Sequence, residues 1–109
     1  MEIKKLTEML SVSSQLNEWD LQQIRQLGFK SIICNRPDGE SIEQTPFQLI
    51  DRQARIVDIK CYYLPVASGN ITQPEANAFL DLLEQAEKPV LAYCRTGSRC
   101  TALWELAIQ

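Results

Sequence analysis

Short apolar runs alternate along the chain with stretches in which apolar residues recur every three or four positions. Runs of the first kind are typical of buried strands, and stretches of the second kind are typical of helices that pack on a sheet. We therefore expect an α/β fold with a mostly parallel central sheet of about four strands and helices on both faces. The predicted strands are residues 9–12, 31–34, 60–64 and 89–93, and the predicted helices are residues 17–27, 45–57, 72–86 and a last one from about residue 100.

Capping signals mark the ends of these predicted helices. Asn17 is placed to cap the first helix, and Gly28 ends it in a left-handed conformation. Thr45 with Gln48, and Thr72 with Glu75, have the spacing of capping boxes at the starts of the second and third helices. The pattern and the caps thus predict the same boundaries.

The chain has 109 residues, of which 45% are apolar, and this is enough for one core but not for two. We expect a single domain over residues 1–109. The net charge of -3 and the absence of a basic run argue against a nucleic-acid partner. No signal peptide and no spanning segment of about 18 apolar residues are visible, so we expect a cytoplasmic protein without a membrane partner.

Four cysteines and no histidine are present, and no two cysteines form a C-x2-C pair. We expect reduced thiols, no metal site and no cofactor.

The residues that carry candidate chemistry follow the clearest strand. This strand ends at Cys94, and the predicted helix begins shortly after Gly97. Such a turn directs backbone N–H groups at one point, where anions bind and where a thiol loses its proton more easily. Arg95 and Arg99 add positive charge, so we predict that Cys94 is a reactive thiolate nucleophile.

The other loop residues fit an anion-binding role. Gly97 allows the backbone to turn closely around a bound group, and the guanidinium of Arg99 can hold a tetrahedral oxyanion. Thr96 and Ser98 are short polar residues suited to the rim. The alternative is a buried, inert Cys94 between solvated arginines.

Three further residues are candidates for the functional site, and each has two interpretations. Cys100 is either a second thiol that reacts with Cys94 or a small residue in the first turn of a helix. Arg36 and Ser68 either belong to the rim of the anion site, at the carboxyl ends of their strands, or are solvated turn residues.

Three segments of the chain carry a further signal, namely residues 93–104, residues 36–40 and residues 10–15. Together they resemble the phosphatase-like domain family of bacterial beta-lactamase hydrolase-like proteins. The resemblance implies a fold like that of the tyrosine and dual-specificity phosphatases. It also implies that sulfur transfer occurs in some members and that a sulfide-oxidising enzyme is a partner.

The resemblance leaves two chemistries open, phosphate hydrolysis and sulfur transfer. The length of the loop and the lack of a general acid for the leaving group separate them. Cys94 and Arg99 form a C-x4-R loop, whereas cysteine phosphatases use C-x5-R, and Cys100 stands where their arginine is expected. Between Asp58 and Asp81 the only acidic residue is Glu75, which the predicted capping box uses. Because sulfur transfer needs no leaving-group acid, we favour a rhodanese-like sulfurtransferase with a Cys94 persulfide.

Two other functions remain as alternatives. One is a cysteine-dependent phosphatase of the tyrosine or dual-specificity type. The other is a non-catalytic phosphatase-like binding module. The substrate is then either a small anionic sulfur donor or a phosphorylated compound.

Overall fold

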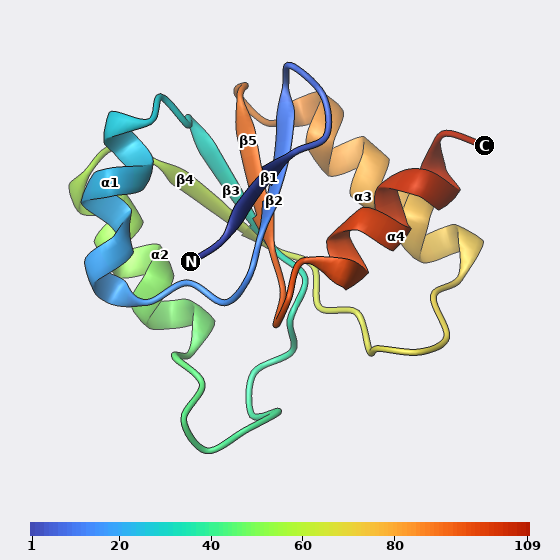
Figure 1. Ribbon diagram of the computed structural model, residues 1–109, viewed down its shortest axis with the longest axis horizontal. Helices are drawn as coiled ribbons and strands as arrows, with labels where there is room; N and C mark the ends of the chain where they lie inside the picture. The colour runs from blue at the N-terminus through green and yellow to red at the C-terminus, as the bar shows by residue number, and fades with distance from the viewer.

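A five-stranded sheet forms the centre of the computed structural model, which describes residues 1–109 (Figure 1). The strands lie in the order β1-β2-β5-β3-β4, and every neighbouring pair is parallel except the antiparallel pair of β1 and β2. The strands are β1 (Ile3–Lys5), β2 (Leu10–Ser13), β3 (Ser31–Cys34), β4 (Lys60–Tyr63) and β5 (Val90–Tyr93). The predicted mostly parallel α/β sheet is confirmed.

The edge strand β1 is the one that the sequence does not predict. It contains a single apolar residue, the half-buried Ile3, followed by two exposed lysines, so it carries no hydrophobic signal. Its pairing with β2 is reinforced by a hydrogen bond from the Glu2 backbone N–H to Ser14 Oγ, at 3.0 Å. The sheet therefore has one strand more than the predicted four.

Helices cover both faces of the sheet, as predicted (Figure 1). One face carries the short 3-10 helix η1 and helices α1 and α2, and the other carries α3 and α4. The helices are η1 (Glu18–Asp20), α1 (Leu21–Gln26), α2 (Phe47–Ile56), α3 (Gln73–Gln85) and α4 (Ser98–Ala107). None of them is long and apolar enough to cross a membrane.

The central strand β5 contributes to the core on both faces of the sheet. Val90 and Ala92 pack with α3 and α4, whereas Leu91 and Tyr93 pack with α1 and α2. This alternation follows from the two-residue period of a strand. All four side chains are buried, because β5 lies in the middle of a parallel sheet that helices cover on both sides.

One of the two predicted capping boxes is confirmed and the other is wrong. Thr72 and Glu75 cap α3 reciprocally. At α2, however, Thr45 donates a hydrogen bond to Asn17 Oδ1, and the Phe47 backbone N–H is satisfied by Asp38 Oδ1 at 2.9 Å. The turn after β3 brings Asp38 to this helix end, and a capping signal read from adjacent residues does not include such a distant partner.

The loops that follow the parallel strands gather at one edge of the sheet. They are residues 14–17 after β2, residues 35–46 after β3, residues 64–72 after β4 and residues 94–97 after β5. Ligands bind at this edge in open α/β sheets. The fold therefore places Cys94 among three loops from distant parts of the sequence.

Candidate active site

The loop that carries Cys94 is held by the backbone of the neighbouring strand. The Cys94 N–H donates to Ser13 O at 3.3 Å, and the Gln15 N–H donates to Arg95 O at 3.1 Å. Gly97 has a φ of 95°, a left-handed conformation that favours glycine, and α4 begins at the next residue. The helix thus begins two residues before Cys100, and its N-terminus faces the Cys94 sulfur.

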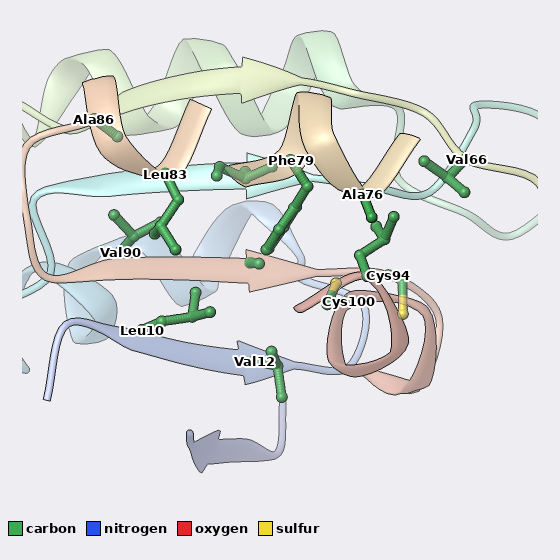
Figure 2. Packing of buried hydrophobic residues seen from close by; sticks show 13 residues of the cluster. Leu10, Val12, Val66, Ala76, Phe79, Leu83, Ala86, Val90, Cys94 and Cys100 are labelled. Carbon is green, nitrogen blue, oxygen red and sulfur yellow. The ribbon is translucent and has the colours of Figure 1, made fainter. Parts of the chain in front are cut away.

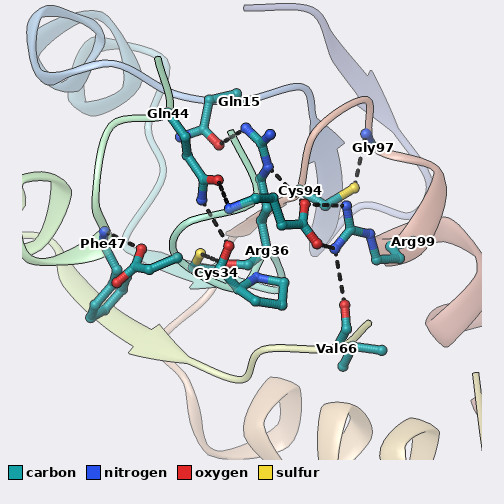
Figure 3. A network of polar contacts seen from close by, with 12 residues as sticks. Gln15, Cys34, Arg36, Gln44, Phe47, Val66, Cys94, Gly97 and Arg99 are labelled. Carbon is teal, nitrogen blue, oxygen red and sulfur yellow. Dashed lines mark hydrogen bonds and ion pairs between the residues drawn. The ribbon is translucent and has the colours of Figure 1, made fainter. Parts of the chain in front are cut away.

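Hydrogen bonds converge on the Cys94 sulfur. The Gly97 N–H lies 3.1 Å from Sγ (Figure 3), and the Cys100 thiol and the backbone N–H groups of Thr96, Arg99 and Cys100 also donate to it. Led by the Cys100 thiol, these donors outweigh the cost of burial and lower the pKa of Cys94 from 9.0 to about 5. Cys94 is therefore a thiolate at neutral pH.

Cys100 lies against Cys94 in the first turn of α4. Both sulfurs are buried at the start of this helix (Figure 2), and Cys100 is fully buried. Burial raises the pKa of Cys100 well above 9.0, and the hydrogen bond to Cys94 raises it further. Cys100 is thus a small buried helix residue and at the same time a thiol donor to the candidate nucleophile.

We expect Cys100→Ala to raise the pKa of Cys94 by about 1–2 units, because a hydrogen bond to a charged group contributes about 1.5–3 kcal/mol. The ultraviolet absorbance of the thiolate, followed against pH, measures this shift. Burial raises the pKa values of Cys34 and Cys61 to about 11 and about 12, so only Cys94 titrates in the acidic range. Cys100→Ser keeps a donor and serves as the control, and an unchanged titration in Cys100→Ala contradicts the assignment.

Arg99 is held by a carboxylate that the sequence analysis does not identify. Its Nη1 and Nη2 lie 2.9 and 3.0 Å from Glu40 Oε2 and Oε1, and Nη1 also donates to Val66 O at 3.0 Å (Figure 3). Glu40 is 59 residues from Arg99 in the sequence, where it is only the last residue of the segment 36–40 that carries the family resemblance. No local pattern signals this pair.

Arg36 is the third charged residue of this network and contacts Glu40. Its Nε lies 3.0 Å from Glu40 Oε1, and its Nη1 donates to Gln15 Oε1 at 2.9 Å. Only 4% of Arg36 is exposed, so the predictions of a rim residue and of a solvated turn residue are both wrong. Arg36 is a buried support for Glu40, because the turn after β3 folds inward beneath the Cys94 loop.

The carboxylate of Glu40, which Arg36 and Arg99 share, supplies the negative charge of the network. Hydrogen bonds from Arg99, and then from Arg36, lower the pKa of Glu40 below 4.5 despite the opposing effect of burial. Glu40 is therefore ionised at neutral pH. Arg99 uses three of the five N–H donors of a guanidinium in these contacts, which leaves two for a bound oxyanion.

A pocket of about 620 Å³ opens beside this network. It is lined by Glu40, by residues 68, 69 and 71 of the loop after β4, and by residues 95, 96, 98, 99 and 102. Arg95, Thr96 and Ser98 are exposed and, together with Ser68, line the pocket. No group of three or more His, Cys, Asp or Glu side chains is placed to hold a metal ion.

The pocket contains no free carboxylic acid. Residues 64–72 include no Asp or Glu, and the Oε1 of Glu75 accepts hydrogen bonds from Thr72 N and Oγ1 at 2.9 and 3.1 Å. Glu40 is the only acidic residue that lines the pocket, and two arginines hold it ionised.

Comparison with known proteins identifies the family. The model of the beta-lactamase hydrolase-like protein, phosphatase-like domain, matches residues 2–109. The chain belongs to this family. The phosphatase-like domain is 32% identical over 106 residues to a beta-lactamase hydrolase-like protein of Agrobacterium fabrum, covering 97% of this chain and 25% of that protein. A Xylella fastidiosa protein with the same description is 31% identical over 107 residues, covering 98% of this chain and 25% of that protein. The chain thus spans about a quarter of the length of these curated relatives.

Solved structures place the phosphatase-like domain among cysteine-phosphatase folds. A candidate phosphatase from Neisseria meningitidis is 46% identical and superposes with a TM-score of 0.87 over 92% of this chain and 71% of that chain. The catalytic core of the PP-IP phosphatase Siw14 from S. cerevisiae, in complex with citrate, is 20% identical, with a TM-score of 0.74 over 93% of this chain and 60% of that chain. TpbA from P. aeruginosa, in complex with phosphotyrosine, is 17% identical, with a TM-score of 0.71 over 93% and 58%. The last two show the fold alone.

These findings support the phosphatase alternative better than sulfur transfer. The family and the 46% identical structure are both described as phosphatase-like or as a phosphatase, and neither description names a sulfur donor or a sulfide-oxidising partner. The C-x4-R count and the missing acid, on which the expectation of sulfur transfer depends, therefore do not separate the two chemistries.

Proposed function

We propose that the phosphatase-like domain is a cysteine-dependent phosphatase in which Cys94 is the nucleophile. The observation that carries the proposal is the set of donors around Cys94 Sγ, which lowers its pKa to about 5 directly before the loop residues that line a polar pocket. A thiolate stabilised in this way attacks electrophiles at neutral pH. The 46% identity to the candidate phosphatase from N. meningitidis supports a phosphate substrate.

The reaction takes place in two steps. The Cys94 sulfur attacks the phosphorus atom, the S–P bond forms, and the leaving oxygen departs with the electron pair of the broken P–O bond. The loop N–H groups of Thr96 to Arg99 and the two remaining donors of Arg99 stabilise the charge on the phosphoryl oxygens. Water then attacks the phosphocysteine, Cys94 leaves as a thiolate, and both protons of the water leave with the inorganic phosphate.

Glu40 and Arg36 position Arg99 for this role. Without the carboxylate, the Arg99 side chain would keep only its contact with Val66 O. Because Glu40 is fixed by Arg36, the guanidinium of Arg99 is oriented before substrate binds, which lowers the entropic cost of reaching the transition state.

One experiment distinguishes phosphate hydrolysis from sulfur transfer. The purified protein is incubated with 4-nitrophenyl phosphate, and separately with thiosulfate followed by intact-mass analysis under native conditions. We expect release of inorganic phosphate and no mass change with thiosulfate. A mass gain of one sulfur atom without phosphate release supports sulfur transfer, and neither reaction supports a binding module.

A further inference from the structure

The pocket that Glu40 and Arg99 line offers no proton to a leaving group. Glu40 is held as a carboxylate by two arginines, and Glu75 is engaged at the start of α3. The chain has no histidine, and the Cys100 thiol is fully buried against Cys94. The Cys94 thiolate can attack a phosphoryl group. However, no side chain that lines the pocket can act as a general acid at neutral pH.

This absence restricts the substrates that can react. A general acid typically contributes about 10²–10⁴-fold to the rate, and an alkyl phosphate without one must expel a strongly basic alkoxide. A phosphoanhydride instead expels a phosphate, which spreads its negative charge over several oxygens and is far less basic than an alkoxide, so it leaves as a stable anion without a general acid.

We propose that the site acts on phosphoanhydrides in preference to alkyl phosphomonoesters; this inference rests on the proposed phosphatase function. Cys94 attacks the terminal phosphorus, and the bridging P–O bond breaks. The remaining phosphate takes the electron pair and leaves as an anion. Water then hydrolyses the phosphocysteine and restores the Cys94 thiolate.

The lining of the pocket suits a charged leaving group. Arg95 lines the pocket and takes part in no ion pair, and Ser68, Thr96 and Ser98 add hydroxyl groups. The apolar lining residues are Ile71 and Ala102 only, so no aromatic ring is available to stack on an aryl group. The volume of about 620 Å³ leaves room for a second phosphate beside the reacting one.

The test compares kcat/KM for inorganic pyrophosphate, 4-nitrophenyl phosphate, phenyl phosphate and O-phosphoserine on the same protein. We expect pyrophosphate and 4-nitrophenyl phosphate to react, phenyl phosphate to react more slowly, and phosphoserine to fall at least about 10²-fold below pyrophosphate. Phosphoserine within tenfold of pyrophosphate overturns the inference while the phosphatase function stands. Hydrolysis of the two aryl phosphates without hydrolysis of pyrophosphate also overturns the inference, while the phosphatase function stands. Failure of all four substrates overturns the proposed function itself.

A variant tests whether Arg95 receives the leaving phosphate. Arg95→Ala should raise KM for pyrophosphate about tenfold more than it raises KM for 4-nitrophenyl phosphate, because only pyrophosphate carries the second charged group. Arg52→Ala, which removes an exposed and unpaired arginine on α2, is the matched control. Equal effects of Arg95→Ala on both substrates contradict a contact with the leaving group.

Discussion

Cys94→Ser should lower kcat/KM for phosphate release by at least about 10⁴-fold, since loss of the nucleophile removes the covalent route. The serine hydroxyl is far less acidic than the thiol, and the donors that hold the Cys94 sulfur as a thiolate do not ionise it at neutral pH. Its smaller oxygen also fits the loop without strain, so the fold should remain intact. Phosphate release from 4-nitrophenyl phosphate measures the loss.

The control is Cys61→Ser, which changes a half-buried cysteine on β4 away from the loop. It should retain activity close to that of the wild type. A Cys94→Ser protein that folds and hydrolyses the substrate at more than about a hundredth of the wild-type rate contradicts the role of Cys94.

The lowered pKa of Cys94 also determines how the stability of the fold changes with pH. A thiol with a pKa of about 5 in the folded chain and 9.0 in an exposed state stabilises the fold fully above pH 9 and loses this contribution as the pH falls toward 5. The difference in the free energy of unfolding between wild type and Cys94→Ser should therefore increase from pH 5 to pH 9.

Glu40→Gln should destabilise the domain by about 1–3 kcal/mol and disable the site, because it leaves the buried guanidinium groups of two arginines without their counter-charge. The side chains of Arg36 and Arg99 are only 5% and 8% exposed, and Glu40 is the sole carboxylate that pairs with them. The glutamine side chain keeps its shape and one acceptor oxygen, so the loss reports the charge. Urea unfolding measures the stability, and phosphate release measures the activity.

Glu43→Gln is the matched control, since Glu43 lies three residues further along the same loop, is exposed and forms no ion pair. It should change the free energy of unfolding by less than about 0.5 kcal/mol. Stabilities of the two variants within experimental error of each other contradict the structural role of Glu40. A Glu40→Gln protein with higher activity than the wild type shows that the carboxylate blocks Arg99 rather than positioning it.

The sequence contains the information for the central strand and the nucleophile loop because both depend on neighbouring residues. The apolar run that ends at Cys94, the left-handed Gly97 and the following helix are local features, and the structure places them as predicted apart from a two-residue earlier start of α4. The cap of α3 by Thr72 and Glu75 is equally local.

The features that the sequence does not predict depend on distant residues. Glu40 reaches Arg99 across 59 residues, and Asp38, rather than Thr45, caps α2. The strand β1 is held by pairing with β2 rather than by an apolar pattern. Whether Arg36 is solvated also depends on how its turn folds, and this turn carries the side chain beneath the loop.

The expectation of sulfur transfer also depends on information that the sequence does not contain. The sequence shows that an acid is missing, but it does not show which chemistry avoids the need for one. Sulfur transfer avoids it, and so does transfer of a phosphoryl group from a good leaving group. The comparisons with known proteins support phosphatase chemistry over sulfur transfer, and the second explanation is the one that we propose.

The most direct test of the central claim is to trap the intermediate on Cys94. The protein is mixed with 4-nitrophenyl phosphate, quenched with acid within the first turnovers, and analysed by intact-mass and peptide mass spectrometry. We predict one added phosphoryl group, located on the peptide that contains Cys94 and absent from Cys94→Ser. Release of phosphate by the wild type with no phosphorylated Cys94 at any quench time, together with undiminished activity of Cys94→Ser, would contradict the account.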